Sequence, residues 1–314
     1  MSFILDILNR VFVLSFVFAI IVSVFAMLFF WGKYLTYPER KLGLPEWKFR
    51  RDIRRLKARA PTELSQVGVS LSNVPPEIVE LRSLKKLNLR ANYLKKLPPE
   101  IGQLQSLVSL SVTANWLESL PPEIGLLGEL QCLKLDLNRL SNLPPEIGKL
   151  ENLRDLNIEE NRFARLPSAI FQLHRLERLN AHYNRLEGVP PEIGRLENLK
   201  TLILSGNPIT TLPPEIGQLT NLEVLEFSKT KISTLPPEIG RLTKLRKIVA
   251  FYTNITNLPV ELGRLPALDT LWIRKRALVF PPQEVARRGT AAILAFLREH
   301  DKEARSDAIS AAQA

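Results

Sequence analysis

The stretch LRSLKKLNLRANYLKKLPPEIGQL, Leu81 to Leu104, decides the fold because the chain repeats its pattern over most of its length. The asparagine at its centre recurs every 23 residues, and threonine or arginine holds the same position later in the chain. These positions are Val69, Asn92, Asn115, Asn138, Asn161, Asn184, Asn207, Thr230, Thr253 and Arg276. Ten copies at one fixed interval predict a solenoid, in which each coil buries its apolar side by packing on its neighbours.

Each coil combines a short strand with a return segment. Leu87 and Leu89 alternate with Asn88, which is the period-two pattern of a strand with one buried face. The strand cannot continue through Pro98 and Pro99, because proline has no N–H to donate to a ladder. We therefore expect the chain to turn after each strand and to return along the other side of the coil.

Three further positions predict how the turns are stabilised. Gly102 tolerates a positive φ, which we expect where the return segment bends. Asn92 lies where the strand ends, so its side-chain amide can bond to the backbone of its own coil and of the next one. Glu100 follows two prolines at the first turn of a short helical segment, where a carboxylate suits the helix dipole. The same structural role, rather than catalysis, is expected for Glu123, Glu146, Glu192, Glu215 and Glu238.

These residues resemble the leucine-rich repeat consensus, which reads LxxLxLxxNxLxxLPPEIGxL in this chain, from roughly Leu64 to Val285. The LPPEIG form is similar to that of the plant intracellular Ras-group leucine-rich repeat proteins and of many bacterial ones. The resemblance implies an α/β solenoid of about ten 23-residue repeats over residues 61–285. It also implies a curved horseshoe with a parallel sheet on its concave side, used as a recognition surface for diverse partners.

The N-terminal region contains an apolar stretch, VFVLSFVFAIIVSVFAMLFFW, from Val11 to Trp31. A helix of this length reaches about 30 Å, which is enough to span the hydrocarbon core of a bilayer. A cleaved signal peptide is the alternative, but its apolar region is usually shorter, its start more basic, and its end marked by small residues. We therefore expect residues 1–32 to form a retained transmembrane anchor.

Residues 33–60 form a basic segment directly after this stretch, with ten lysines and arginines against three acidic residues. The positive-inside rule then places the repeats on the cytoplasmic side of the plasma (inner) membrane. The single cysteine, Cys132, agrees with a reducing compartment, since extracellular repeat domains commonly carry paired cysteines. Nucleic acid is not expected as a partner, because the positive charge is local rather than spread over the repeats.

Residues 45–60 read as a short amphipathic helix. Its apolar stripe, formed by Phe49, Ile53, Leu56 and Ala60, is expected to cap the first coil. Its polar side carries arginines that can contact anionic lipid headgroups, and the two roles are compatible. These arginines are Arg50, Arg51, Arg54 and Arg55.

At the other end, residues 286–305 are expected to form a capping helix, followed by a disordered tail at residues 306–314. The stretch FPPQEVARRGTAAILAFLREHDKEAR is similar to the segment that joins leucine-rich repeats to the GTPase domain of bacterial Roco proteins. The sequence contains no G-x-x-x-x-G-K-[ST] phosphate loop, so the similarity implies a shared repeat ancestry and a helical cap rather than GTPase activity.

The chain offers little for catalysis or metal binding. A nucleophilic Cys132 needs a base within hydrogen-bond reach, but the nearest histidine on the sheet, His182, is two coils away, or about 10 Å. His174 and His300 lie elsewhere and form no zinc-ligand cluster. We expect a binding protein with no cofactor and no metal, rather than an enzyme.

The outward side chains of the strands predict the binding surface. Charged residues and a tyrosine occupy the middle of the sheet, and aromatic residues beside an arginine occupy its C-terminal third, a combination typical of interface anchors. The expected partner-binding residues are Asp155, Glu159, Arg178, His182, Tyr183, Phe251, Tyr252, Trp272 and Arg274. Alternatively, some of the aromatic residues simply cover the end of the array, where the consensus is degraded.

Together these features predict a membrane-anchored scaffold that binds another protein on the concave face. Two alternatives stay open. The chain can be a regulatory or scaffold subunit for a small or Roc-type GTPase in signal transduction, as the family resemblance implies. It can also be an extracellular leucine-rich repeat receptor that lacks disulfides.

Overall fold

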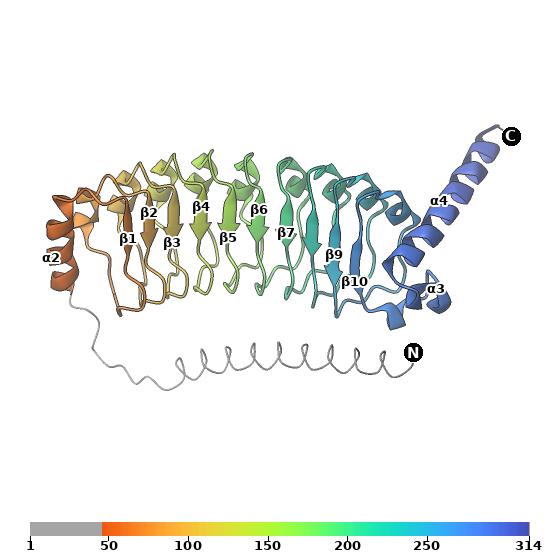
Figure 1. Ribbon diagram of the computed structural model, residues 1–314, viewed down its shortest axis with the longest axis horizontal. Coiled ribbons are helices and arrows are strands. Elements are labelled where there is room, and N and C mark those ends of the chain that lie inside the picture. The colour runs from red at the N-terminus through yellow and green to blue at the C-terminus, as the bar shows by residue number, and fades with distance from the viewer. Residues whose placement is uncertain (1–45, 314) are drawn as a thin grey trace, which may run out of the picture. The chain divides into compact units, whose positions relative to one another are not determined.

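The computed structural model describes residues 46–313, and the predicted transmembrane segment lies outside them (Figure 1). Within the described range, no helix is both long enough and apolar enough to cross a membrane. Ten strands form a single parallel sheet in sequential order, from β1 to β10. The strands are β1 Glu63–Ser65, β2 Lys86–Asn88, β3 Ser109–Ser111, β4 Cys132–Lys134, β5 Asp155–Asn157, β6 Arg178–Asn180, β7 Thr201–Ile203, β8 Val224–Glu226, β9 Lys247–Ala250 and β10 Thr270–Ile273.

Each strand is followed by a turn and a short 3-10 segment, as the paired prolines predict. In seven of these segments the first proline of the pair precedes the segment and the second opens it, so the missing N–H falls where no intrahelical partner exists. These segments are η1 Pro76–Glu80, η2 Pro99–Gln103, η3 Pro122–Leu126, η4 Pro145–Lys149, η5 Ser168–Gln172, η6 Pro191–Arg195, η7 Pro214–Gln218, η8 Pro237–Arg241, η9 Val260–Arg264 and η10 Lys275–Ala277.

The register between neighbouring strands is uniform. Leu87 pairs with Leu110, which pairs with Leu133, and the same 23-residue step continues to Leu271. Every leucine or isoleucine in this central strand row from Leu87 onward is at most 1% exposed, so the row forms the spine of one continuous core. The constant interval thus places equivalent side chains in stacked rows along the sheet.

The asparagine ladder is present, but it connects each coil to the preceding one. Asn92 Oδ1 accepts a hydrogen bond from the backbone N–H of Leu71 in the preceding coil at 2.9 Å. Its Nδ2 donates to the carbonyl of Gln66 in the preceding coil at 2.7 Å and to that of Leu89 in its own coil at 2.9 Å. Our expectation of a bond to the following coil was therefore wrong in direction. The amide lies between its own turn and the backbone of the preceding coil, which supplies both an N–H and a carbonyl to it.

The repeated glycine is required because of close packing between coils, and not because of a positive φ as predicted. Gly102 has no positive φ, and a Cβ at this position would lie 2.3 Å from the carbonyl oxygen of Glu123 in the next coil. The 3-10 segments of adjacent coils therefore approach too closely for any side chain here. Positive φ values fall instead on the residue before nine of the ten ladder positions, and most of these residues are not glycine. These residues are Gly68, Ala91, Ala114, Leu137, Glu160, Tyr183, Gly206, Lys229 and Tyr252.

Helices close both ends of the core. The helix α2, Glu46–Lys57, buries Phe49 and Ile53 against the first coil and half-buries Leu56, as the apolar stripe predicts. Ala60 was wrongly included in the stripe, because the helix ends at Lys57 and Ala60 is exposed in the turn that follows. At the other end, α3, Gln283–Arg287, leads into α4, Thr290–Gln313. Figure 1 shows the strands standing side by side between these two caps.

The C-terminal helix is clamped to the last coils by Gly263 and Arg264. A Cβ on Gly263 would lie 2.5 Å from the backbone nitrogen of Arg298, so α4 packs directly on the η9 backbone. The Nε of Arg264 donates to both carboxylate oxygens of the buried Asp301, at 3.0 and 2.9 Å. The helix continues to Gln313, whereas we expected it to end at residue 305. Arg305 is followed by alanine-rich sequence that contains neither glycine nor proline, and nothing in that composition stops a helix.

Candidate functional surface on the strands

The central part of the sheet carries a cluster of charged side chains from β5, β6 and the residues that follow them. The Nε of Arg178 lies 3.9 Å from an oxygen of Asp155 on the neighbouring strand. The Nδ1 of His182 lies 3.6 Å from Glu159, and the other carboxylate oxygen of Glu159 accepts a hydrogen bond from Asn180 Nδ2 at 2.7 Å. The structure therefore brings together four of the predicted residues as two neighbouring pairs.

Tyr183 extends this cluster toward the C-terminal coils. Its ring stacks on His182 with a centroid separation of 4.2 Å and an interplanar angle of 17°. Its hydroxyl accepts a hydrogen bond at 2.5 Å from Nζ of Lys229, which lies two coils further along. Lys229 was not predicted as part of the site. The signal that could have found it is its spacing of 46 residues, because this multiple of the repeat places both residues in one row.

Burial shifts the protonation equilibria of the central side chains. It raises the pKa of Asp155, although Arg178 and Lys134 act in the opposite direction. It lowers the pKa of His182, although Glu159 opposes the shift. Burial thus favours the uncharged forms of these two side chains relative to the same groups in water.

The only cysteine lies beside this cluster and does not have the environment of a nucleophile. Cys132 Sγ approaches Asp155 Oδ2 at 3.9 Å. Burial and the charge of Asp155 both raise the pKa of this thiol, which disfavours the reactive thiolate. Among residues 46–313, no group of three or more histidine, cysteine, aspartate or glutamate side chains is arranged to hold a metal ion.

An aromatic patch covers the sheet near its C-terminal end. The rings of Phe251 and Trp272 lie 6.0 Å apart, and these two side chains are 41% and 50% exposed. Tyr252, in a left-handed turn beside them, is 73% exposed. We call Phe251, Tyr252 and Trp272 the aromatic patch. Arg274 is also exposed, two residues after Trp272.

An ion pair between Lys247 and Glu226 lies at the edge of this patch and contacts Trp272. Neither residue was predicted as part of the site. The Nζ of Lys247 lies 4.9 Å from the ring centroid of Trp272 and 2.9 Å from a carboxylate oxygen of Glu226. The indole is therefore oriented by a cation that is itself fixed by the neighbouring strand. This arrangement is a rigid apolar surface with a charged border.

The helix α2 presents its arginines in two directions. Arg50 pairs with Glu77 of the first coil at 3.3 Å, so it faces the repeats. Arg51 lies 5.4 Å from the ring of Trp47, which is 60% exposed, and Arg54 and Arg55 are also exposed. Trp47 was not predicted as part of this surface, although its place on the same side as Arg51 follows from helical periodicity.

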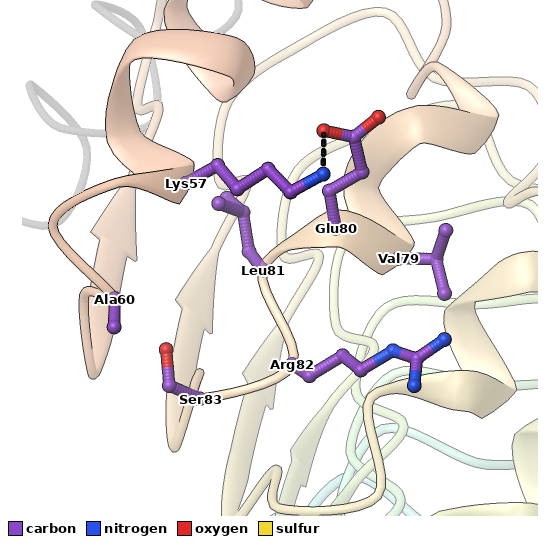
Figure 2. A pocket seen from close by; sticks show the side chains of 7 residues that line it. All are labelled: Lys57, Ala60, Val79, Glu80, Leu81, Arg82 and Ser83. Atoms are coloured by element: carbon purple, nitrogen blue, oxygen red, sulfur yellow. Dashed lines mark ion pairs between the residues drawn. The ribbon is translucent and has the colours of Figure 1, made fainter.

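Figure 2 shows a shallow hollow between the end of α2 and the first coil. Lys57 crosses it to pair with Glu80 at 3.4 Å, and Arg82 and Ser83 complete the far side. The hollow is thus crossed by an ion pair that attaches the cap, and the other polar groups do not converge on a common point. It fits a structural joint better than a ligand site.

Comparison with known proteins agrees with this architecture. The sequence model of the family described as a leucine-rich repeat region matches residues 64–142 and 190–283, and a second leucine-rich repeat model matches residues 128–186. No curated protein matches the chain.

Three solved structures illustrate the likeness. A leucine-rich repeat protein of Leptospira interrogans is 39% identical, with a TM-score of 0.63, over 64% of this chain and 52% of that one. A plant peptide hormone receptor, solved in complex with RGF2, is 34% identical, with a TM-score of 0.60, over 67% of this chain and 35% of the receptor. An internalin from Listeria monocytogenes shares the fold at 18% identity and a TM-score of 0.56, over 74% and 76% of the two chains. The chain thus spans about half of the Leptospira protein and about a third of the receptor.

Proposed function

The chain belongs to the leucine-rich repeat family, and from this premise we propose that it is a membrane-anchored scaffold that binds a partner protein on the concave face of its repeats. The architecture is that of a protein-interaction module. The single observation that carries the proposal is the aromatic patch. Three large aromatic side chains face solvent on one part of the sheet, and exposed aromatic clusters of this kind are typical of interaction sites.

The patch is well suited to serve as an anchor because it is preformed. Its strands β9 and β10 are paired over four residues each, and Lys247 orients the indole of Trp272. A partner that docks here loses little free energy to ordering the surface. The charged cluster around His182 lies on the same sheet and supports selectivity, since its groups accept a partner only with complementary charge.

Membrane attachment is the second part of the proposal. It is supported by the apolar stretch Val11–Trp31, which is long enough to span a bilayer, and by the basic residues that follow it. The outward side of α2 carries Trp47 with Arg51, Arg54 and Arg55, a combination suited to anionic headgroups at an interface. Arg50 is not included, because it is paired with Glu77. The repeats then lie on the cytoplasmic side of the plasma (inner) membrane.

We propose recognition without bond-making chemistry. The raised pKa of the Cys132 thiol supports this, since it opposes nucleophilic activation. The complex of the plant receptor with RGF2 supports a polypeptide as the kind of partner, although that receptor shares only part of its length with this chain.

The test is affinity capture from detergent-solubilised membranes with the native chain and with the triple variant Phe251→Ala, Tyr252→Ala, Trp272→Ala. The matched control is Leu126→Ala with Val279→Ala, which removes exposed apolar side chains outside the strands. We expect partner recovery to fall by about tenfold or more in the triple variant, as for loss of a hot spot, and to persist in the control. Equal recovery by all three folded proteins would remove this site.

The identity of the captured protein separates the alternatives. A small or Roc-type GTPase would favour the regulatory-subunit hypothesis, and a secreted ligand would favour the extracellular receptor. Labelling of the chain in intact and in permeabilised cells with a membrane-impermeant reagent measures the topology independently. Labelling of the repeats in intact cells would contradict the proposed cytoplasmic placement.

A further inference from the structure

A second row of side chains runs along the carboxyl ends of the strands, outside the concave face. It consists of the residue directly after the ladder asparagine in five consecutive coils: Tyr93, Trp116, Arg139, Arg162 and Arg185. We call these five residues the aromatic–arginine ladder. Each backbone N–H in the row donates to a carbonyl of the preceding coil, at 2.8 to 2.9 Å. The side chains therefore project from a fixed backbone at a regular interval.

The first three members contact one another. The rings of Tyr93 and Trp116 lie 4.9 Å apart, and the guanidinium carbon of Arg139 lies 5.1 Å from the Trp116 ring. Tyr93 is 37% exposed, and Arg162 and Arg185 are exposed as well. The row therefore begins as an aromatic platform and continues as a line of positive charge.

The fold does not use these arginines as ion-pair partners. Within the part of the chain that the structure describes, Arg139, Arg162 and Arg185 have no carboxylate within ion-pair distance. The opposite edge of the sheet differs, because Arg154 and Lys200 both pair with Glu177 there, at 2.5 and 2.7 Å. Arg154 and Lys200 are thus neutralised by a neighbouring coil, whereas Arg162 and Arg185 face solvent and Arg139 packs half-exposed on the Trp116 ring.

We propose that the aromatic–arginine ladder binds an acidic, extended segment of a partner protein, with carboxylates on the arginines and an apolar side chain on the aromatic pair. Adjacent coils are about 4.8 Å apart, so three arginines cover about 10 Å. Alternate residues of an extended peptide are about 6.6 Å apart, and two of them therefore fall within this span. An arginine guanidinium can form two parallel hydrogen bonds with a carboxylate. The guanidinium of Arg139 is already oriented by its contact with the indole ring of Trp116.

A protein segment fits this edge better than a nucleic acid. The two rows beside it carry Asp136 and Glu159 in one and Glu160 in the other, and burial together with these two acids raises the pKa of Glu160. A phosphate backbone, which is charged at every nucleotide, would meet these carboxylates. A peptide can place its acidic residues on the arginines and neutral or basic residues beside Glu160.

The proposal does not rest on the aromatic patch, and its test is separate. The probe is a fluorescein-labelled peptide of alternating glutamate and serine, titrated with the purified full chain in detergent and followed by anisotropy. The test variant combines Arg139→Gln, Arg162→Gln and Arg185→Gln.

The control combines Lys149→Gln, Arg195→Gln and Arg241→Gln, which removes three exposed cations from the 3-10 segments and changes the net charge equally. A double variant, Arg162→Gln with Arg185→Gln, leaves the contact between Arg139 and Trp116 intact.

We expect the test variant to bind the peptide about tenfold or more weakly, the double variant to show an intermediate loss, and the control to stay within about twofold of the native chain. The counterpart peptide of alternating glutamine and serine should not bind. Equal weakening by test and control variants would show non-specific attraction and overturn the proposal. Binding of single-stranded oligonucleotide or anionic vesicles that is tighter than peptide binding and lost in the test variant would overturn the choice of a protein segment.

Discussion

The ring of Tyr183 lies across the backbone of Gly206, the residue at the same position of the next coil. A Cβ on Gly206 would lie 2.5 Å from Cδ1 of Tyr183, and the glycine has a φ of +73°. The tyrosine hydroxyl then reaches Lys229 in the coil beyond. Three consecutive coils are thus joined on the binding face through a glycine that leaves room for the ring.

Replacement of this glycine should disturb both the coil and the site. We expect Gly206→Ala to lower the free energy of unfolding by about 2 kcal/mol, from the left-handed backbone and the clash with Tyr183. Gly188→Ala is the control, because a Cβ there meets no atom within 4 Å and its φ is not positive. Urea denaturation measures both. Equal stability of the two variants would contradict the close contact.

Two copies of the PPEIG motif should respond differently to the same substitution. A Cβ on Gly125 would lie 2.4 Å from the backbone oxygen of Glu146, which cannot move without the next coil. A Cβ on Gly148 would instead meet first the side-chain oxygen of Gln172, which can rotate away, while the nearest backbone atom, the oxygen of Ala169, is 3.2 Å away. We expect Gly125→Ala to cost about 2 to 3 kcal/mol and Gly148→Ala about 1 kcal/mol or less, measured by urea denaturation. The reverse order would show that side-chain packing, not backbone approach, selects glycine.

Loss of one ladder asparagine should be strongly destabilising. Asn161 accepts from the N–H of Leu140 at 2.9 Å and donates to the carbonyls of Leu135 and Ile158 at 3.0 and 3.1 Å, all in buried surroundings. Asn161→Ala leaves the buried N–H of Leu140 without its acceptor. The two carbonyls lose one donor each but keep the amides of Asn138 and Asn184, so we expect a loss of about 2 to 3 kcal/mol. Asn161→Thr should lose less, because Thr230 and Thr253 keep the bond to the carbonyl three residues earlier. The exposed Asn73→Ala is the control, and a comparable loss there would contradict the ladder's role.

The stability of the protein should depend on pH through His182. Burial lowers its folded-state pKa below the ordinary value of 6.5, and Lys229 acts in the same direction, while Glu159 and Glu226 oppose them. As the pH falls through 6.5, the unfolded chain takes up a proton before the folded one does, so stability decreases. Above about pH 7.5 both states are neutral and the contribution is constant. His182→Gln should remove this part of the decrease between pH 7.5 and 5. An imidazole that titrates above 6.5 in the folded chain by NMR would contradict the prediction.

The C-terminal clamp should control fraying of the last coils. Asp301→Asn removes the charge that Arg264 contacts through both carboxylate oxygens. Because Arg264 is partly exposed, we expect a moderate loss of about 1 to 2 kcal/mol, confined to the C-terminal end of the array. Hydrogen exchange should show faster exchange in β10 and α4, with β3 unchanged. Glu303→Gln, at an exposed position of the same helix, is the control, and uniform acceleration along the whole chain would contradict local fraying.

The sequence predicts the features that depend on the repeat interval. The strand positions, the asparagine ladder, the amphipathic cap and the outward rows all follow from periodicity and side-chain chemistry. The reason for Gly102 was not predictable in the same way, because the close approach involves Glu123 in another coil. The direction of the Asn92 bonds likewise depends on how one turn leans on the preceding one.

For the binding surface, periodicity identified which residues share a row but not which of them touch. The pairs Asp155 with Arg178 and Phe251 with Trp272 are neighbours in adjacent coils, and both were predicted as site residues. The hydrogen bond between Tyr183 and Lys229 spans two coils, and it requires a glycine at position 206 to leave room for the tyrosine ring. Because it depends on three residues in three coils, it could not be predicted from the residues taken one at a time. Whether the predicted residues bind a partner remains a prediction.

The uniform register of the sheet means that whole repeats can be removed or added without disturbing the pairing of the remaining strands. Every step from β1 to β10 repeats the same pairing at the same interval, so the junction between any two coils is chemically similar to the next. Excision of one whole interior unit, such as residues 116–138, would join two halves whose surfaces already match. The reach of the molecule can therefore be shortened or extended by whole units, while the two caps and the terminal surfaces keep their own local structure.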